Sequence, residues 1–171
     1  MSHKTSPVIV SSSHLVSSSC PQLSEFEYGL TMMNNAFLRW MQHCSQAAGV
    51  TELSSLDIQV VHNVAHRDRA KKLADICFSL NLEDSHNVAY SLRKLVKLAM
   101  ITSTKKGKET FYKPSEQGWQ FCERYKAVRE QCLIDSLKDL NLTEQQLSEM
   151  ASALRVLSGF YDQSSRSAAS L

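Results

Sequence analysis

The sequence predicts a mainly helical α+β domain that contains one short β-hairpin. Six segments carry apolar residues at helical spacing, and a segment between the fourth and fifth of them has a strand-like period. Only five glycines and three prolines occur among 171 residues, which argues against an all-β fold with many tight turns and against a disordered chain. This length suits one globular domain, or one domain with appended arms.

Three helices are expected in the first half of the chain. A capping box at Ser24 and Glu27 precedes the first of them, which has an unusually bulky apolar face. A second capping box, at Ser54 and Asp57, precedes the next helix. The third is expected at about 69–80, with its apolar side chains pointing inward.

A fourth helix is expected at 84–98, followed by two strands at 100–104 and 110–113. The turn between the strands is 105–108, which places three lysines around one glycine. A further helix follows Pro114 and Ser115, and a last one follows a capping box at Thr143 and Gln146. The resulting organisation has five parts: a flexible Ser-rich arm at 1–22, a long helix at 23–52, a compact lobe at 53–115, long helices at 116–162 and a disordered tail at 163–171.

The composition limits where the chain is expected to act. Eight serines interrupt the first 22 residues, so the unbroken apolar core of a signal peptide is missing. No run approaches 18 apolar residues, and hence no membrane helix is predicted. Five scattered cysteines without a Cys-x-x-Cys pair argue against a disulfide framework or a closed zinc site. We therefore expect a cytoplasmic protein without a bound metal or other cofactor.

Positive charge is concentrated in the middle of the chain. Residues 62–113 carry eleven basic and five acidic side chains, a net charge of +6, whereas the remainder carries −4. A basic centre between acidic ends is typical of a surface that binds a polyanion. The alternative is a basic surface that is merely solvated.

The 84–98 helix presents amide, aromatic and basic groups on one face, as a helix that enters the major groove of DNA does. Residues near its start are expected to reach bases, and basic residues farther along to meet phosphates. Glu83 and Asp84 should point away from the DNA backbone. The predicted DNA contacts are Ser85, His86, Asn87, Tyr90, Ser91, Lys94, Arg69, Lys71, Lys105, Lys106 and Lys108.

Local patterns at 53–57, 69–74, 84–88 and 114–118 give the chain a resemblance to the MarR family of bacterial winged helix-turn-helix regulators, over roughly residues 24–162. The resemblance implies a winged helix-turn-helix lobe flanked by N- and C-terminal dimerisation helices. It also implies a homodimer that presents two recognition helices to a pseudo-palindromic double-stranded DNA site, and control by a small aromatic effector bound near the dimerisation helices.

The chain departs from the family pattern at two places. The hairpin has lysines where the family commonly has an Asp-x-Arg-Asp-x-Arg run, and lysine reads a narrow minor groove less well than arginine does. Ala99 stands where the family favours glycine after the recognition helix. An alanine with positive φ costs about 1 kcal/mol, so this helix is expected to end differently.

Apolar faces on the first and last helices exceed what a small lone bundle hides easily, which favours a second copy as partner. An intramolecular core is the alternative. The residues expected at the dimer interface are Phe26, Leu30, Met33, Trp40, Leu147, Leu154, Leu157 and Phe160.

The residues leave three alternatives to a DNA-binding regulator: a protein-binding module, an enzyme and a redox sensor. A winged helix that binds an acidic protein and never touches DNA shares all the patterns above. Catalysis is not expected, because His62 and His66 lack the glutamate of a His-Glu-x-x-His zinc site, and no phosphate-binding loop or nucleophile motif occurs. Cys20 is a candidate redox sensor, whereas Cys44, Cys77, Cys122 and Cys132 are expected in apolar cores. Met32, Trp40, His43 and His62 either line an effector pocket or pack in a core.

Overall fold

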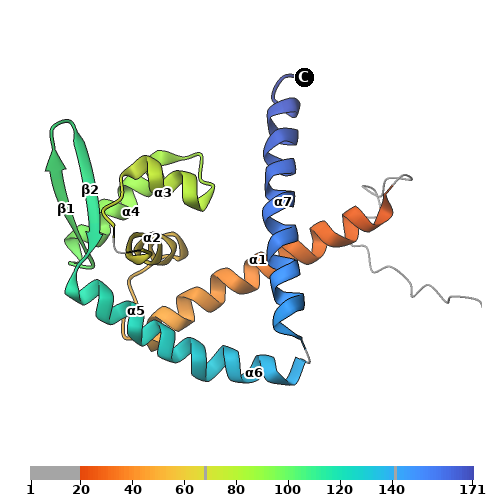
Figure 1. The fold of residues 1–171 in the computed structure, drawn as a ribbon, viewed down its shortest axis with the longest axis horizontal. Helices are drawn as coiled ribbons and strands as arrows, with labels where there is room; N and C mark the ends of the chain where they lie inside the picture. The colour runs from red at the N-terminus through yellow and green to blue at the C-terminus, as the bar shows by residue number, and fades with distance from the viewer. Residues whose placement is uncertain (1–19, 68, 141) are drawn as a thin grey trace, which may run out of the picture. The chain divides into compact units, whose positions relative to one another are not determined.

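The computed structural model describes residues 20–67, 69–140 and 142–171, and it confirms a mainly helical fold with one two-stranded antiparallel sheet (Figure 1). The chain divides into two compact units, and the boundary between them in the sequence lies between Val128 and Arg129. The first unit contains α1 (Pro21–Ala47), α2 (Ser55–Ala65), α3 (Leu73–Leu80), α4 (Ser85–Lys97), β1 (Ile101–Lys106), β2 (Glu109–Pro114) and most of α5 (Glu116–Arg129). The predicted arm at 1–22 lies largely outside the described residues.

The core of the first unit is built around α2 and α4. Apolar side chains of both helices are fully buried, and Cys44 at the end of α1 and Phe121 on α5 cover them. The spacing of these residues matches the predicted inner faces of the helices. The core side chains from α2 and α4 are Ile58, Val60, Val61, Val64, Val88, Leu92 and Leu95.

Local capping decides where most of the helices begin. Ser54 caps α2 through the predicted capping box with Asp57, and Thr143 caps α7 in the same way. The expected box at Ser24 is wrong, since α1 already begins at Pro21, with Cys20 as its N-cap. Proline suits this first helical position because its missing N–H has no intrahelical partner there.

The helix expected at 69–80 begins four residues late. The main chain of Lys71 exchanges two hydrogen bonds with Tyr112 on β2, at 3.0 and 2.8 Å, so this segment is extended and joins the hairpin. Helix α3 then starts at Leu73, with Asp75 accepting a hydrogen bond from the backbone N–H of Lys72. The prediction failed because a partner 41 positions along the chain competes with the local helical pattern.

The exit from α4 also corrects an expectation. Ala99 does adopt a left-handed conformation, with φ of 55°, so the helix ends as a glycine would end it. Its carbonyl accepts a hydrogen bond from Ser115 Oγ. Gly118 then lets α5 approach this turn, because a Cβ on Gly118 would lie 2.0 Å from the carbonyl oxygen of Met100.

The hairpin pairs Ile101 with Pro114 at its base and Lys106 with Glu109 at its tip. A two-residue loop of Gly107 and Lys108 connects the strands, and Gly107 supplies the positive φ of 61° that such a loop requires. The hairpin is confirmed, but its strands are longer than the predicted 100–104 and 110–113, so Lys105 and Lys106 lie in β1 rather than in the predicted turn at 105–108.

In the second unit the chain remains helical from Arg129, through a π-helical turn (Glu130–Ile134), α6 (Asp135–Leu137) and a 3-10 turn (Lys138–Leu140). Helix α7 (Glu144–Ala168) follows, so most of the tail expected to be disordered is helical. None of its residues is buried. No helix in the described part of the chain is long and apolar enough to cross a membrane.

Candidate nucleic-acid interface

The outer face of α4 carries the predicted base-reading residues in exposed positions. Ser85, His86 and Asn87 occupy the first turn, and Tyr90 follows with 65% of its surface exposed. Arg93, one turn farther on, is exposed as well. The inner face of the same helix is buried in the core, so the outer face is held rigidly on the lobe.

Asp84 both caps α4 and orients Asn87. One carboxylate oxygen of Asp84 accepts hydrogen bonds from the backbone N–H groups of His86 and Asn87, at 2.9 and 3.3 Å. The other accepts from Asn87 Nδ2 at 2.7 Å. Because a carboxylate only accepts hydrogen bonds, the amide nitrogen of Asn87 must face Asp84. The amide oxygen and the second N–H of Asn87 remain for another partner.

Ser91 and Lys94, also predicted as DNA contacts, are used inside the lobe instead. Ser91 is 1% exposed and donates a hydrogen bond to Asp57 Oδ1 at 2.6 Å. Lys94 forms an ion pair with Asp57 Oδ2 at 2.7 Å and also donates to the carbonyl of Glu52. Lys94 was expected on the outer face and Ser91 among the base-reading residues near the start of the helix, but both bond the buried carboxylate of Asp57 on α2.

Asp57 is the centre of this buried polar network. Burial alone would raise the pKa of its carboxyl group, but hydrogen bonds from Lys94, Ser91 and Ser54 outweigh burial and lower that pKa below its ordinary value. The carboxylate therefore stays ionised and ties the start of α2 to the inner face of α4. Sequence reasoning interpreted Asp57 only as a helix cap.

Lys71 is likewise unavailable on the surface. It is 5% exposed, and its ammonium group donates a hydrogen bond to the backbone carbonyl of Asn63. Arg69, two residues earlier, is exposed as predicted. The two residues differ because the Lys71 side chain is held by its hydrogen bond to the end of α2.

The hairpin displays the three predicted lysines, Lys105, Lys106 and Lys108, in exposed positions. A fourth cation, Lys72, was missed. It forms an ion pair with Glu109 at 2.7 Å, which raises the pKa of Lys72, and it lies 5.4 Å from the centre of the Phe111 ring. The hairpin acid is thereby paired with Lys72.

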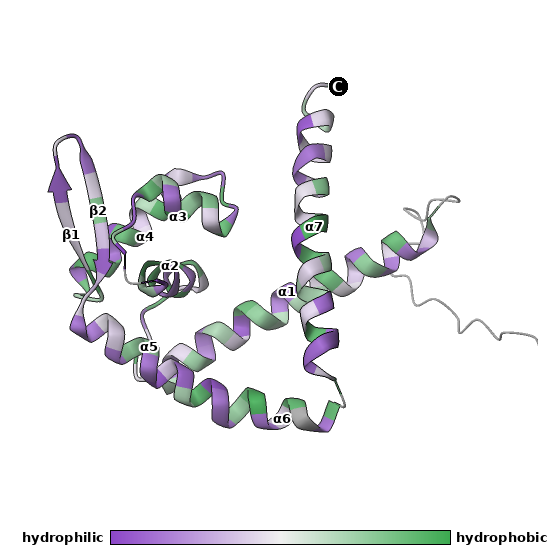
Figure 2. Ribbon diagram, viewed as in Figure 1, coloured by the Kyte–Doolittle hydropathy of each residue, from purple (hydrophilic) through white to green (hydrophobic). Residues whose placement is uncertain are grey.

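The residues expected at a dimer interface lie on two amphipathic helices (Figure 2). Five are exposed and three are partly buried, Trp40 among the latter being packed against the core. The exposed members are Leu30, Met33, Leu147, Leu154 and Phe160, and the partly buried ones are Phe26, Trp40 and Leu157.

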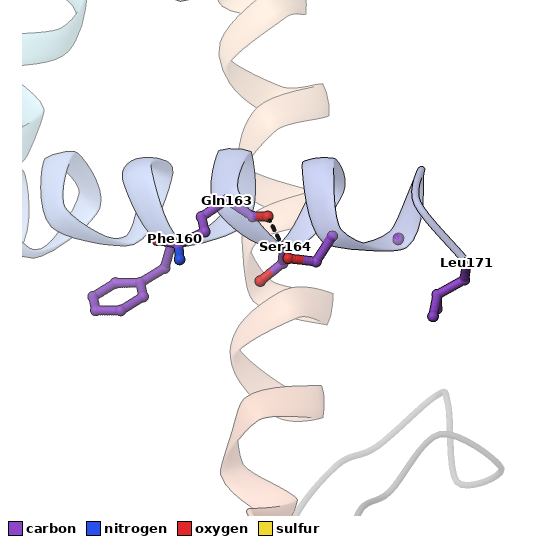
Figure 3. A pocket seen from close by; sticks show the side chains of 6 residues that line it. Phe160, Gln163, Ser164 and Leu171 are labelled. Carbon is purple, nitrogen blue, oxygen red and sulfur yellow. Dashed lines mark hydrogen bonds between the residues drawn. The ribbon is translucent and has the colours of Figure 1, made fainter.

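The end of α7 has a shallow groove that continues its exposed apolar surface (Figure 3). Phe160 and Leu171 lie at its two ends, with Gln163 and Ser164 between them. The carbonyl of Gln163 accepts a hydrogen bond from Ser167 Oγ, at 3.1 Å. The groove thus has apolar ends and a polar middle, in which Ser167 bonds the main chain of α7.

The cysteines differ widely in exposure, and the described titratable groups do not form a metal site. Among the described residues, no three His, Cys, Asp or Glu side chains gather as metal ligands would. Cys20 is exposed, Cys44 and Cys77 are buried, and burial raises the pKa of the Cys122 thiol to about 11. Cys132, expected in a core, is exposed.

His62 is partly buried, and its ring packs against two aromatic side chains of the core. Its ring lies 4.6 Å from that of Tyr125 and 5.9 Å from that of Phe121, measured between centroids. Its Nε2 atom is buried and has no hydrogen-bond partner among the described residues, and burial lowers the pKa of the imidazole.

Comparisons with known proteins agree with this geometry. Residues 53–118 match the family model of the winged helix DNA-binding domain. A search of curated protein sequences found no match.

Solved structures of regulators share the fold at low sequence identity. A MarR-family transcriptional regulator from Rhodococcus sp. RHA1 is 11% identical, with a TM-score of 0.64 over 78% of this chain and 91% of that one. MarR from Staphylococcus aureus, solved with salicylate and kanamycin, is 12% identical, with a TM-score of 0.65 over 83% and 93%. FabT from Streptococcus pneumoniae, solved with DNA, is 13% identical, with a TM-score of 0.63 over 82% and 98%. Residues 53–118 therefore resemble the winged helix DNA-binding domain, and the chain shares the fold of the MarR-type transcriptional regulators.

Proposed function

We propose that this protein is a homodimeric transcriptional regulator that binds double-stranded DNA sequence-specifically. Helix α4 would enter the major groove, and the β1–β2 hairpin would contact the backbone or the minor groove. The observation that carries the proposal is the exposed first turn of α4, with its amide fixed by Asp84, inside a matched winged-helix DNA-binding domain.

Asn87 is the proposed base reader. An asparagine recognises adenine through two hydrogen bonds, accepting from N6 and donating to N7. The bond from Asn87 Nδ2 to Asp84 uses one amide hydrogen and leaves the oxygen and the second hydrogen for this pair. Asp84 is thus a positioning residue, because it holds the amide ready before DNA arrives. Its carboxylate accepts hydrogen bonds from two backbone N–H groups and one side-chain amide of the first turn of α4.

The hairpin supplies charge rather than base recognition. Lys105, Lys106 and Lys108 each present a compact ammonium group, which suits phosphate contact better than bidentate recognition of a base. Lys72 neutralises Glu109, so the acid does not repel the DNA backbone from the hairpin. We assign these three lysines to phosphates or to the rim of the minor groove.

A second copy of the chain would cover the apolar surfaces of α1 and α7. An apolar stripe on α1 runs from Leu23 through Leu30 to Phe37, all exposed, and continues into the buried Met41. Helix α7 has no buried residue over 25 positions, and a helix of that kind gains its stability by packing against a partner. Two copies would present two α4 helices about one helical turn of DNA apart.

A small aromatic acid is the proposed effector class. Salicylate is bound in the solved structure of S. aureus MarR, whose fold this chain shares. In this chain Trp40 is only partly buried and lies against the core, on the side of α1 that the dimer proposal uses. Titrating salicylate while following Trp fluorescence and DNA affinity would test this class, and unchanged DNA affinity at saturation would reject it.

Selection of random duplexes on the purified protein tests the proposed function. We expect a two-fold symmetric motif with an adenine at the position read by Asn87. In Asn87→Ala, selectivity for that adenine should fall, by the 1–3 kcal/mol typical of one bidentate contact. In Asp84→Ser, which keeps an N-cap but cannot hold the amide, the preference should weaken less. If the protein binds only an acidic protein partner and no DNA, the selection will enrich no duplex sequence, and the proposed function is wrong.

A further inference from the structure

A cavity of about 230 Å³ lies at the corner where α2 ends and α3 begins, apart from the outer face of α4. Three cationic side chains, Arg67, Arg69 and Lys71, line it. Its polar but uncharged lining comes from Asn63, His66 and Ser79. Three like charges around a small cavity repel one another, so either a bound anion or contacts within the fold must stabilise them.

The single carboxylate that lines the cavity among the described residues is already used. Asp75 Oδ2 accepts a hydrogen bond from the backbone N–H of Lys72 at 3.0 Å and stabilises the first turn of α3. Neither Arg67 nor Arg69 forms an ion pair with a described residue. Three cationic side chains therefore face one carboxylate among the described residues, so the lining carries an excess of positive charge.

Lys71 is the buried member of the group. Its ammonium group bonds the backbone carbonyl of Asn63 and lies 3.4 Å from the amide oxygen of the same residue, both of which are neutral acceptors. Burial, and then the positive charges of Arg69 and Arg67, lower the pKa of Lys71 and outweigh the opposing effect of the Asp75 carboxylate. A buried cation without a carboxylate partner is costly, and a bound anion would offset that cost.

The backbone of the loop is strained at the same place. Arg67 has φ of 64°, a left-handed conformation that is unfavourable for a residue with a Cβ atom. Strain of this kind gathers at ligand-binding sites, where the fold holds a residue against its preference. The opposite wall is fixed by a hydrogen bond of 2.6 Å from Asn63 Nδ2 to Ser79 Oγ.

We infer that this corner is an anion site that takes a phosphate group. The guanidinium groups of Arg67 and Arg69 offer paired donors that match phosphate oxygens, and the ammonium group of Lys71 adds a point charge at the buried end. The phosphate comes from one of two sources: a free phosphate or phosphorylated small molecule, or a phosphodiester of DNA. The second source rests on the proposed function, whereas the first does not.

Occupation of the site would act on the hairpin. The main chain of Lys71 is paired with Tyr112 on β2 through two hydrogen bonds, so a ligand that holds Lys71 also holds the base of the hairpin. Phosphate should therefore shift the backbone amide resonances of β2 as well as those of the loop.

Lys71 also has a purely structural explanation, since its bond to the Asn63 carbonyl satisfies the end of α2. The test therefore changes the two arginines. Inorganic phosphate is titrated against the full chain without DNA, at constant ionic strength set with chloride, and amide resonances are followed by NMR. We expect saturable shifts in wild type and at least a tenfold weaker affinity in Arg67→Gln/Arg69→Gln.

Two matched variants separate geometry and charge from folding. Lys126→Gln/Arg129→Gln removes the same charge from exposed positions on α5 and should leave phosphate affinity unchanged. Arg67→Lys/Arg69→Lys keeps the charge but removes the paired donors, and should bind phosphate with intermediate affinity. Equal weakening in the α5 variant would overturn the site, because it would show that only net charge matters.

The DNA arm measures how affinity for a selected duplex depends on salt. If free phosphate does not saturate but Arg67→Gln/Arg69→Gln lowers the salt slope by about 0.9 per lost contact, the site takes a DNA phosphodiester. If free phosphate saturates while wild type binds no duplex, the site stands and the proposed function fails. If neither the phosphate titration nor the salt slope responds to the two arginines, the inference is wrong.

Discussion

The winged lobe and the long helices use their apolar residues in opposite ways. In the lobe, Val60 on α2 and Leu92 on α4 are completely buried, and a polar network around Asp57 is satisfied inside. On α7, Met150 and Leu154 are 54% and 48% exposed, and no residue of that helix is buried. The comparison teaches that the lobe completes its own core, whereas the long helices leave apolar side chains exposed, which is where we propose that a second copy binds.

Helix α1 shows both behaviours along one stripe. Met41 and Cys44, near its end, are buried in the lobe core, while Leu30 and Phe37, on the same stripe, are 39% and 47% exposed. The periodicity is the same in both halves, so what changes is the availability of a neighbour. An apolar pattern therefore predicts that a helix face is buried, but it does not tell whether the same chain or a second chain packs against that face.

The largest effect is expected from charges on the exposed stripe of α7. Leu147→Glu/Leu154→Glu should make the protein monomeric and lower its DNA affinity about 100-fold or more, because each lobe then binds its half-site alone. Sedimentation and binding titrations measure both changes. The control Ser152→Glu adds charge to another face of α7 and should remain dimeric. A monomeric variant with wild-type affinity would show that the helices do not join two lobes.

The next largest effect should come from inside the lobe. Asp57→Ala leaves the ammonium group of Lys94 without its carboxylate and the hydroxyl of Ser91 without its acceptor. We expect the free energy of unfolding of the lobe to fall by about 3 kcal/mol, measured by urea denaturation. The double variant Asp57→Ala/Lys94→Met should recover part of the loss. A fall below about 1 kcal/mol would contradict a central role for this network.

Sequence reasoning predicted the order of the elements because that order depends on local signals. The capping boxes at Ser54 and Thr143 and the glycine loop of the hairpin act within a few residues, and all three are confirmed. The late start of α3 was missed because Lys71 pairs with Tyr112, far away in sequence. Ala99 was expected to avoid positive φ, but Ser115 and the approach at Gly118 hold that turn in place.

The candidate interface was predicted in part. The helical pattern and the position of the helix start identified the exposed Ser85, His86, Asn87 and Tyr90 correctly, since exposure follows from such local features. It misplaced Ser91 and Lys94, whose direction depends on a buried acid on another helix. The capping preference of aspartate was the one available signal for Asp84, and it did not reveal the bond to the Asn87 side chain.

A smaller effect is expected on the surface of the lobe. Lys105→Ala/Lys106→Ala/Lys108→Ala should reduce the dependence of DNA affinity on salt, by about 0.9 in slope for each phosphate contact that is lost. Affinity for selected and random duplexes should fall together, because these lysines read no base. Fluorescence anisotropy at several salt concentrations measures the slope. An unchanged slope would remove the hairpin from the interface.

The smallest effect concerns pH and the core of the lobe. Burial lowers the pKa of His62 below the ordinary value of 6.5, so the folded protein keeps this imidazole neutral where the unfolded chain takes up a proton. The stability contributed by neutral His62 is therefore complete above about pH 6.5 and is lost as the pH falls toward the lowered pKa. His62→Leu should lose less stability than wild type between pH 7.5 and 5, in thermal melts. Identical pH dependence would contradict this reading of His62.

The mass of the wild-type protein in solution, alone and on a selected duplex, tests the central claim most directly. Sedimentation should give twice the chain mass of 19.2 kDa for the free protein, and two chains on each symmetric duplex. A single chain of 19.2 kDa that binds the duplex at full affinity would show that α7 and the exposed half of α1 do not join two lobes.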